Sequence, residues 1–138
     1  MMRTLLICSL FVVTGCQTAS LNSQVIKARE MEAKTTLGSW ARTQQAYHIE
    51  KDRFATSNSE LNFSAASGEY YDFNIRDVSP KGALMTADPK KKYEQLSGYF
   101  SLAIYDNGEY SSGVCKLEKP FTSYDNFYDI EIEDCDGY

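Results

Sequence analysis

A proline-free stretch at residues 24–52 constrains the fold of this chain more than any other feature. Apolar or small side chains return in it at heptad spacing: Ile26, Ala33, Trp40 and Tyr47. This spacing places them on one face of a helix and leaves charged side chains on the others. We therefore expect one long amphipathic helix, about 43 Å in length.

The two halves of this helix differ in character. The large apolar groups lie in the C-terminal half, at Leu37, Trp40, Tyr47 and Ile49. We expect that half to pack on a sheet, while the basic, alanine-containing first half projects beyond it. A coiled coil is the weaker alternative, because polar residues fall between the heptad positions.

The pattern then changes to the two-residue period of strands. Residues 71–76 and 83–87 predict two short strands joined by a turn at 79–82. Residues 99–105 and 109–117 predict a hairpin, because Asn-Gly between them supplies the positive φ angles of a tight turn. The alternate apolar side chains of its first strand are expected to face the helix: Phe100, Leu102 and Ile104. The fold class is α+β, with the long N-terminal helix packed on a four-stranded antiparallel sheet.

Composition excludes several function classes. The 138 residues allow one domain of ordinary size, and a net charge of -5 argues against general attraction to nucleic acid. A single histidine cannot form a His-based zinc site. We expect His48 to be a solvated or partly packed surface residue rather than a catalytic base. With no phosphate loop or nucleophile motif in the sequence, we expect neither an enzyme nor a cofactor.

The first residues indicate export. Residues 1–15 have a basic start, a short apolar run and small residues, which is the pattern of a secretory signal. The residues that follow, Val-Thr-Gly-Cys ending at Cys16, resemble the bacterial lipobox. That resemblance implies cleavage before Cys16, a lipid on this residue and a membrane anchor. Since residue 17 is Gln rather than Asp, it also favours the outer membrane, with the head in the periplasm or at the cell surface.

This interpretation divides the chain into a signal (1–15), a lipidated Cys with a polar tether (16–23) and a head (24–138). The alternative is a plain signal peptide, which leaves an odd number of cysteines in an oxidising compartment. With Cys8 removed and Cys16 lipidated, Cys115 and Cys135 remain as a pair. We expect a disulfide between them, closing a C-terminal loop of about 21 residues and contributing roughly 3 kcal/mol. A redox role is the weaker interpretation, because the pair has no Cys-x-x-Cys spacing.

The C-terminal segment is acidic and aromatic. Because aromatic side chains dominate binding hot spots, its aromatic residues are the candidate partner contacts: Tyr124, Phe127, Tyr128 and Tyr138. Packing over the sheet is the alternative for two of them, Phe127 and Tyr128. The acidic residues form a weak candidate calcium site that lacks the spacing of an EF-hand: Asp129, Glu131, Glu133, Asp134 and Asp136. Three lysines at 90–92 could contact phosphate or an acidic partner, although a solvated loop is the simpler expectation.

Residues 32–55, which read EAKTTLGSWARTQQAYHIEKDRFA, are similar to the second half of the long helix in bacterial type IV pilins and pseudopilins. The resemblance implies a loop after the helix, a four-stranded antiparallel sheet and a disulfide-closed C-terminal loop. The chain departs from the family at residues 17–24, which are polar where a pilin has its apolar stem. A head of this kind on a lipid tether would not polymerise as a pilin does.

Two functions follow from this resemblance. The first is a non-enzymatic lipoprotein that binds pilus, pseudopilus or secretin proteins of the type IV pilus or type II secretion systems. The alternative is a periplasmic binding or inhibitor lipoprotein that shares only the fold and recognises an unrelated envelope partner or ligand.

Overall fold

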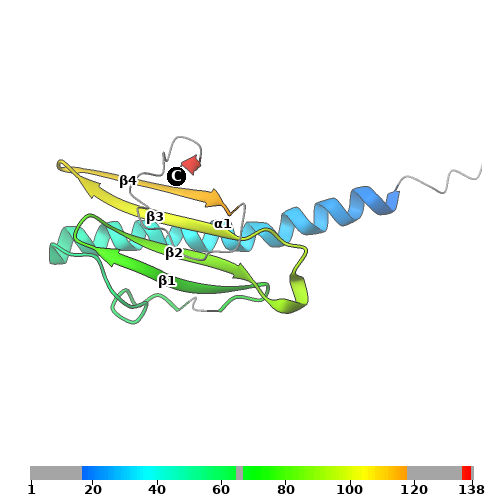
Figure 1. Cartoon of the computed structure of the whole chain (residues 1–138), viewed down its shortest axis with the longest axis horizontal. Coiled ribbons are helices and arrows are strands. Elements are labelled where there is room, and N and C mark those ends of the chain that lie inside the picture. The colour runs from blue at the N-terminus through cyan, green and yellow to red at the C-terminus, as the bar shows by residue number, and fades with distance from the viewer. Residues whose placement is uncertain (1–16, 65–66, 118–134, 138) are drawn as a thin grey trace, which may run out of the picture.

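The computed structural model describes residues 17–64, 67–117 and 135–137. One long helix, α1 (Gln17–Lys51), runs along a face of an antiparallel sheet, and Figure 1 shows its first turns extending beyond the sheet. The remaining elements follow in chain order: β1 (Tyr71–Ser79), β2 (Gly82–Pro89), the 3-10 turn η1 (Lys91–Tyr93), β3 (Tyr99–Asp106), β4 (Glu109–Lys116) and β5 (Asp136–Gly137). The predicted fold class, a long helix on a four-stranded antiparallel sheet, is confirmed, and β5 adds a two-residue edge.

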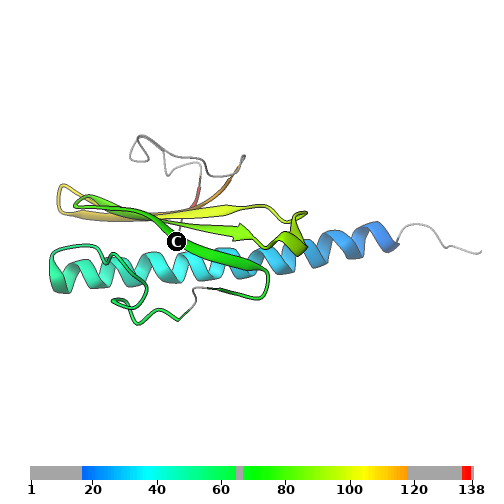
Figure 2. The same cartoon turned by 60° about the horizontal axis from the view of Figure 1, so that its bottom comes forward.

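The sheet is a simple meander in which each strand pairs with the next in the chain. Figure 2 shows it as a layer beside the helix. Asn107 and Gly108 form the tight turn between β3 and β4 with φ angles of 51° and 89°, as the Asn-Gly sequence predicts. This turn and the end of α1 lie at one end of the head, which we call the distal end. The opposite end, where α1 leaves the sheet, is the basal end (Figure 1).

Helix α1 begins at Gln17, so the predicted start at residue 24 was wrong by seven residues. The expected polar tether at 17–23 is helical. Its residues are mostly hydrophilic, but they include neither proline nor glycine, and polarity alone does not oppose a helix. Asn22 and Ser23, just before the predicted start, are therefore exposed positions inside the helix.

The core lies between α1 and the sheet. Leu37 and Trp40 of the helix are fully buried against strand residues such as Tyr71 and Met85. This confirms that the C-terminal half of the helix packs on the sheet. Ile49 does not take part, because its side chain is 69% exposed. It follows the buried His48 by one residue, and a helix turns about 100° per residue, which directs the two side chains differently.

The other face of the sheet carries a second apolar cluster, which contains Leu84, Phe100, Leu102 and Cys115. The prediction that Phe100, Leu102 and Ile104 face the helix was therefore wrong: the β3 residues that pack with the helix include Tyr99, Ala103 and Tyr105. The predicted Cys115–Cys135 disulfide is confirmed, with 4.6 Å between the two Cα atoms. It attaches the end of the chain to this second cluster.

Candidate functional site

The turn after α1 is fixed by one buried glutamine. Gln44 is fully buried, and its Nε2 donates to the carbonyl oxygen of Ala55 at 2.9 Å. Its Oε1 accepts from the amide nitrogen of the same residue, also at 2.9 Å. Phe54 and Ala55 are buried beside it. A glutamine inside the apolar stripe of the helix therefore provides hydrogen-bond partners for main-chain groups at the point where the chain reverses direction.

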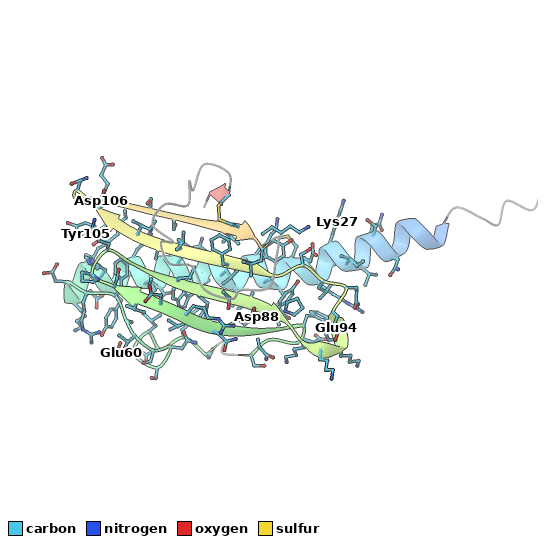
Figure 3. All side chains as sticks on the ribbon, in the orientation of Figure 1. Lys27, Glu60, Asp88, Glu94, Tyr105 and Asp106 are labelled. Atoms are coloured by element: carbon cyan, nitrogen blue, oxygen red, sulfur yellow. A yellow bond between two sulfur atoms is a disulfide. The ribbon has the colours of Figure 1, made fainter. Side chains whose placement is uncertain are left out.

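An aromatic group surrounds the only histidine. His48 is 5% exposed, which corrects the expectation of a surface side chain. Its Nδ1 lies 2.8 Å from the hydroxyl of Tyr110 on β4. The centre of its ring lies 4.5 Å from that of Phe54 and 4.7 Å from that of Tyr105, with the rings tilted against each other. We call His48, Phe54, Tyr105 and Tyr110 the distal cluster, after the end of the head where they lie (Figure 3 labels Tyr105). Burial raises the pKa of the Tyr110 hydroxyl, helped by nearby Tyr105 and Asp52.

The loop that follows α1 is held by an exposed ion pair. Arg53 contacts Glu60 at 3.1 Å and donates to the hydroxyl of Tyr47 at 2.8 Å. Glu60 also accepts from the main-chain nitrogen of Thr56. The bond to Arg53 lowers the pKa of Glu60, and the same bond raises that of Arg53. Because both side chains are exposed, this pair positions the loop and adds little stability.

Two carboxylates of α1 hold the loops of the basal end. Glu30 accepts from the main-chain nitrogen of Ser97 at 2.9 Å and from the hydroxyl of Tyr99 at 3.0 Å. Glu32 accepts from the main-chain nitrogens of Glu69 and Tyr70. Burial alone would raise the pKa of Glu30, but its hydrogen bonds from Ser97 and Tyr99 and the charge of Lys116 lower it below its ordinary value. Both acids therefore have structural partners.

A cationic and aromatic surface lies at the same end. The guanidinium of Arg29 sits 5.1 Å from the ring centre of Tyr70 and 5.3 Å from that of Tyr93. The two rings meet edge to face at 5.1 Å. Lys91 and Lys92 of η1 are exposed beside them, and Lys92 lies over the Tyr93 ring. We call Arg29, Tyr70, Lys91, Lys92 and Tyr93 the basal surface; Glu94, labelled in Figure 3, follows it directly.

Most of the site residues predicted from the sequence fall outside the described part of the chain. These are the lipidation residue Cys16, the aromatic candidates Tyr124, Phe127, Tyr128 and Tyr138, and the calcium candidates Asp129, Glu131, Glu133 and Asp134. Asp136 lies in β5, paired with Val114 of β4. Among the described residues, no group of three or more His, Cys, Asp or Glu could hold a metal ion.

Apart from the lysines at 90–92, the basal and distal groups escaped the sequence reasoning, because their members come from distant parts of the chain. Tyr110 is 62 residues from His48, and Ser97 is 67 residues from Glu30. For the turn after α1, the signal was present within residues 32–55, but we assigned that sequence to a resemblance and not to the contact between Gln44 and Ala55.

Comparison with known protein families decides the fold family. Residues 30–127, more than two thirds of the chain, match the family described as type IV pilin-like G and H. The chain belongs to this family. No curated protein and no solved structure matches it. The match begins at Glu30, which accepts a hydrogen bond from the hydroxyl of Tyr99 on β3, and it includes β1 to β4.

Membership of the type IV pilin-like family implies a location outside the cytoplasm and a relation to pili or secretion. Proteins of pilin-like families are generally structural and not enzymatic. The Cys115–Cys135 disulfide agrees with an oxidising compartment. Within the described residues, no helix combines the length and hydropathy of a membrane-spanning segment.

Proposed function

We propose that this protein is a non-enzymatic, lipid-anchored pilin-like protein whose head binds type IV pilus or type II secretion components. One observation carries the proposal: a pilin-like head stands on a helix whose first eight residues follow Cys16 directly and are polar except for Ala19 and Leu21. A pilin has an apolar stem at this place. The head would then be held at the membrane by a lipid on Cys16, in the outer membrane, and would meet its partners from there.

The proposed anchor is tested by replacing its cysteine. Mass spectrometry of the mature protein from membranes should find Cys16 at the N-terminus with the mass of attached acyl chains. The Cys16→Ser variant should lose this mass and leave the membrane fraction. The Cys8→Ser variant is the control, because Cys8 lies in the apolar run of the signal and should not affect the anchor. A mature protein that begins elsewhere and carries no lipid would contradict the anchor.

We place the partner contact on the aromatic side chains of the C-terminal segment: Tyr124, Phe127, Tyr128 and Tyr138. The disulfide attaches this segment to the sheet, which limits the entropy that binding must overcome. Tyr and Trp are enriched in binding hot spots. The segment is also the most acidic part of the chain, which favours a basic surface on the partner.

Photo-cross-linking in living cells tests this contact. A photoreactive residue at Tyr124 or Tyr128 should capture a pilin, a pseudopilin or a secretin, identified by mass spectrometry. The matched control carries the photoreactive residue at Ile49, an exposed apolar position on the outward face of α1. Capture from Tyr128 but not from Ile49 supports the proposal. Capture of an unrelated envelope protein, in cells that make the pilus machinery, would leave only the fold and favour the binding or inhibitor alternative.

A further inference from the structure

The basal surface is placed where a membrane anchor would bring lipid headgroups closest. Helix α1 leaves the head at this end, and the chain from Gln17 to Arg29 rises about 18 Å. The register puts η1 at the same end, because it follows the pairing of Tyr71 with Pro89 and precedes that of Tyr99 with Lys116. With a lipid on Cys16, η1 is therefore among the parts of the head nearest the membrane.

The side chains of this surface suit the boundary between lipid and water. Tyr70 and Tyr93 are half-buried rings with polar hydroxyls, and Arg29 is packed against both. Lys91 and Lys92 of η1 are exposed. Tyrosines collect at headgroup depth, and clusters of lysine and arginine bind anionic lipids. The segment is also firmly held, because Lys90 donates to the carbonyl oxygen of Gly68 and lies 4.0 Å from the Asp72 carboxylate.

Charge and distance limit how this contact can form. Glu69 and Glu94 are exposed at the same end, so the attraction comes from the lysines themselves and not from a large excess of positive charge. Screening at physiological salt restricts it to about 8 Å. A head standing upright on about 18 Å of helix would hold η1 beyond that range. The lysines reach the headgroups only if the head leans until the first turn of α1 and η1 touch the same plane.

We propose that the basal surface binds the anionic phospholipid surface on which the protein is anchored and thereby sets a leaning orientation of the head. This inference rests on the proposed lipid anchor at Cys16 and adds the lipid class and the orientation to it. A lipid contact of this kind orients a head that the acyl chains already hold, so its signature is local protection of Lys91 and Lys92.

Lysine footprinting on the full lipidated protein in vesicles tests the proposal. Acetylation rates are measured by mass spectrometry in vesicles of phosphatidylethanolamine with phosphatidylglycerol, and in vesicles of phosphatidylcholine. Lys91 and Lys92 should react at least threefold more slowly on the anionic vesicles, and 0.5 M salt should remove the difference. Lys51 and Lys81 at the distal end are internal controls that should react equally on both. Equal rates for Lys91 and Lys92 on the two vesicles would overturn the proposal.

A matched pair of charge reversals separates a local contact from net charge. Lys92→Glu should abolish most of the protection of Lys91, whereas Lys81→Glu makes the same change at the distal end and should leave that protection intact. If both variants behave alike, the basal contact is wrong. If the protein fails to float with either kind of vesicle, the proposed anchor at Cys16 is wrong. The inference about the basal surface, which rests on that anchor, is then wrong as well. Protection in intact cells without protection on anionic vesicles would assign the surface to an acidic protein and contradict the lipid contact.

Discussion

Gln44 makes both of its amide hydrogen bonds to the main chain of one residue, Ala55, at 2.9 Å each. The pair joins the C-terminal part of α1 to the chain just after the helix has ended, with Phe54 buried beside it. A buried glutamine is costly unless its amide is satisfied, and here the partner is a main-chain unit that would itself be unpaired without it. The contact thus replaces the hydrogen bonds of regular structure at the point where the chain turns back.

Replacing this glutamine should be among the more damaging single changes in the head. Gln44→Leu leaves the amide and carbonyl of Ala55 buried without partners, and we expect a loss of about 3 kcal/mol in the free energy of unfolding. Urea denaturation followed by Trp40 fluorescence measures it. Gln45→Leu, at the half-buried neighbouring position, should change stability by less than about 1 kcal/mol. Similar losses in both variants would show that the two bonds to Ala55 contribute nothing particular.

The hydroxyl of Tyr110 supports the buried histidine. Tyr110→Phe keeps the ring contacts with His48 and Tyr105 but removes the hydrogen-bond partner of the His48 Nδ1 at 2.8 Å. We expect a loss of about 1 kcal/mol and a shift of the imidazole nitrogen resonances in NMR spectra. Tyr93→Phe removes a hydroxyl at the basal end and should leave those resonances unchanged. Unaltered His48 signals in Tyr110→Phe would contradict the bond.

Glu30 should make stability depend on pH in the acid range. Its pKa in the folded protein lies below the ordinary value of 4.5, so the folded state favours the charged form. The contribution of Glu30 is therefore present above about pH 4.5 and is lost as the pH falls through the lower, folded-state value. Glu30→Gln should cost about 1 kcal/mol at pH 7, and its difference from the wild type should shrink below pH 4. Denaturation curves at several pH values measure this. The exposed Glu50→Gln is the control, and a Glu30→Gln difference that grows in acid would contradict the assignment.

Removing the disulfide should weaken the head without changing the helix and sheet core. The Cys115→Ala/Cys135→Ala double variant releases the end of the chain from the cluster around Phe100 and Leu102. The closed loop of about 21 residues predicts a loss of roughly 3 kcal/mol. Thermal denaturation compares it with the wild type, with and without reductant. Reductant should lower the midpoint of the wild type and leave that of the double variant unchanged.

The sequence predicted those features that local chemistry decides. The Asn107-Gly108 turn follows from two residues that tolerate positive φ, and the Cys115–Cys135 pairing follows from counting the cysteines left once Cys8 is assigned to a signal and Cys16 to a lipid. The heptad spacing around Trp40 correctly identified the buried helix face. In each case a short stretch of sequence, or a simple count, contains the whole physical reason.

The predictions that failed concern features that depend on more than one element of the fold. Strand β3 has apolar or aromatic side chains in both sets of alternate positions, so its two-residue period cannot say whether Tyr99 or Phe100 faces the helix. Residues 17–23 are mostly polar, which argues for exposure but does not distinguish an exposed helix from a tether. His48 is buried because Phe54, Tyr105 and Tyr110 meet around it, and this meeting exists only in the folded chain.

The arrangement of α1 along the strands also determines how the head responds to mechanical load. A pull on the helix at Gln17, opposed by a partner held on the sheet, acts along the common axis of the helix and the strands (Figure 1). Glu30 near the basal end and His48 at the distal end attach the same helix to different strands. The load is then shared as shear over all of these contacts at once and does not peel one strand at a time. The helix is thus the element through which a pulling force would pass into the domain.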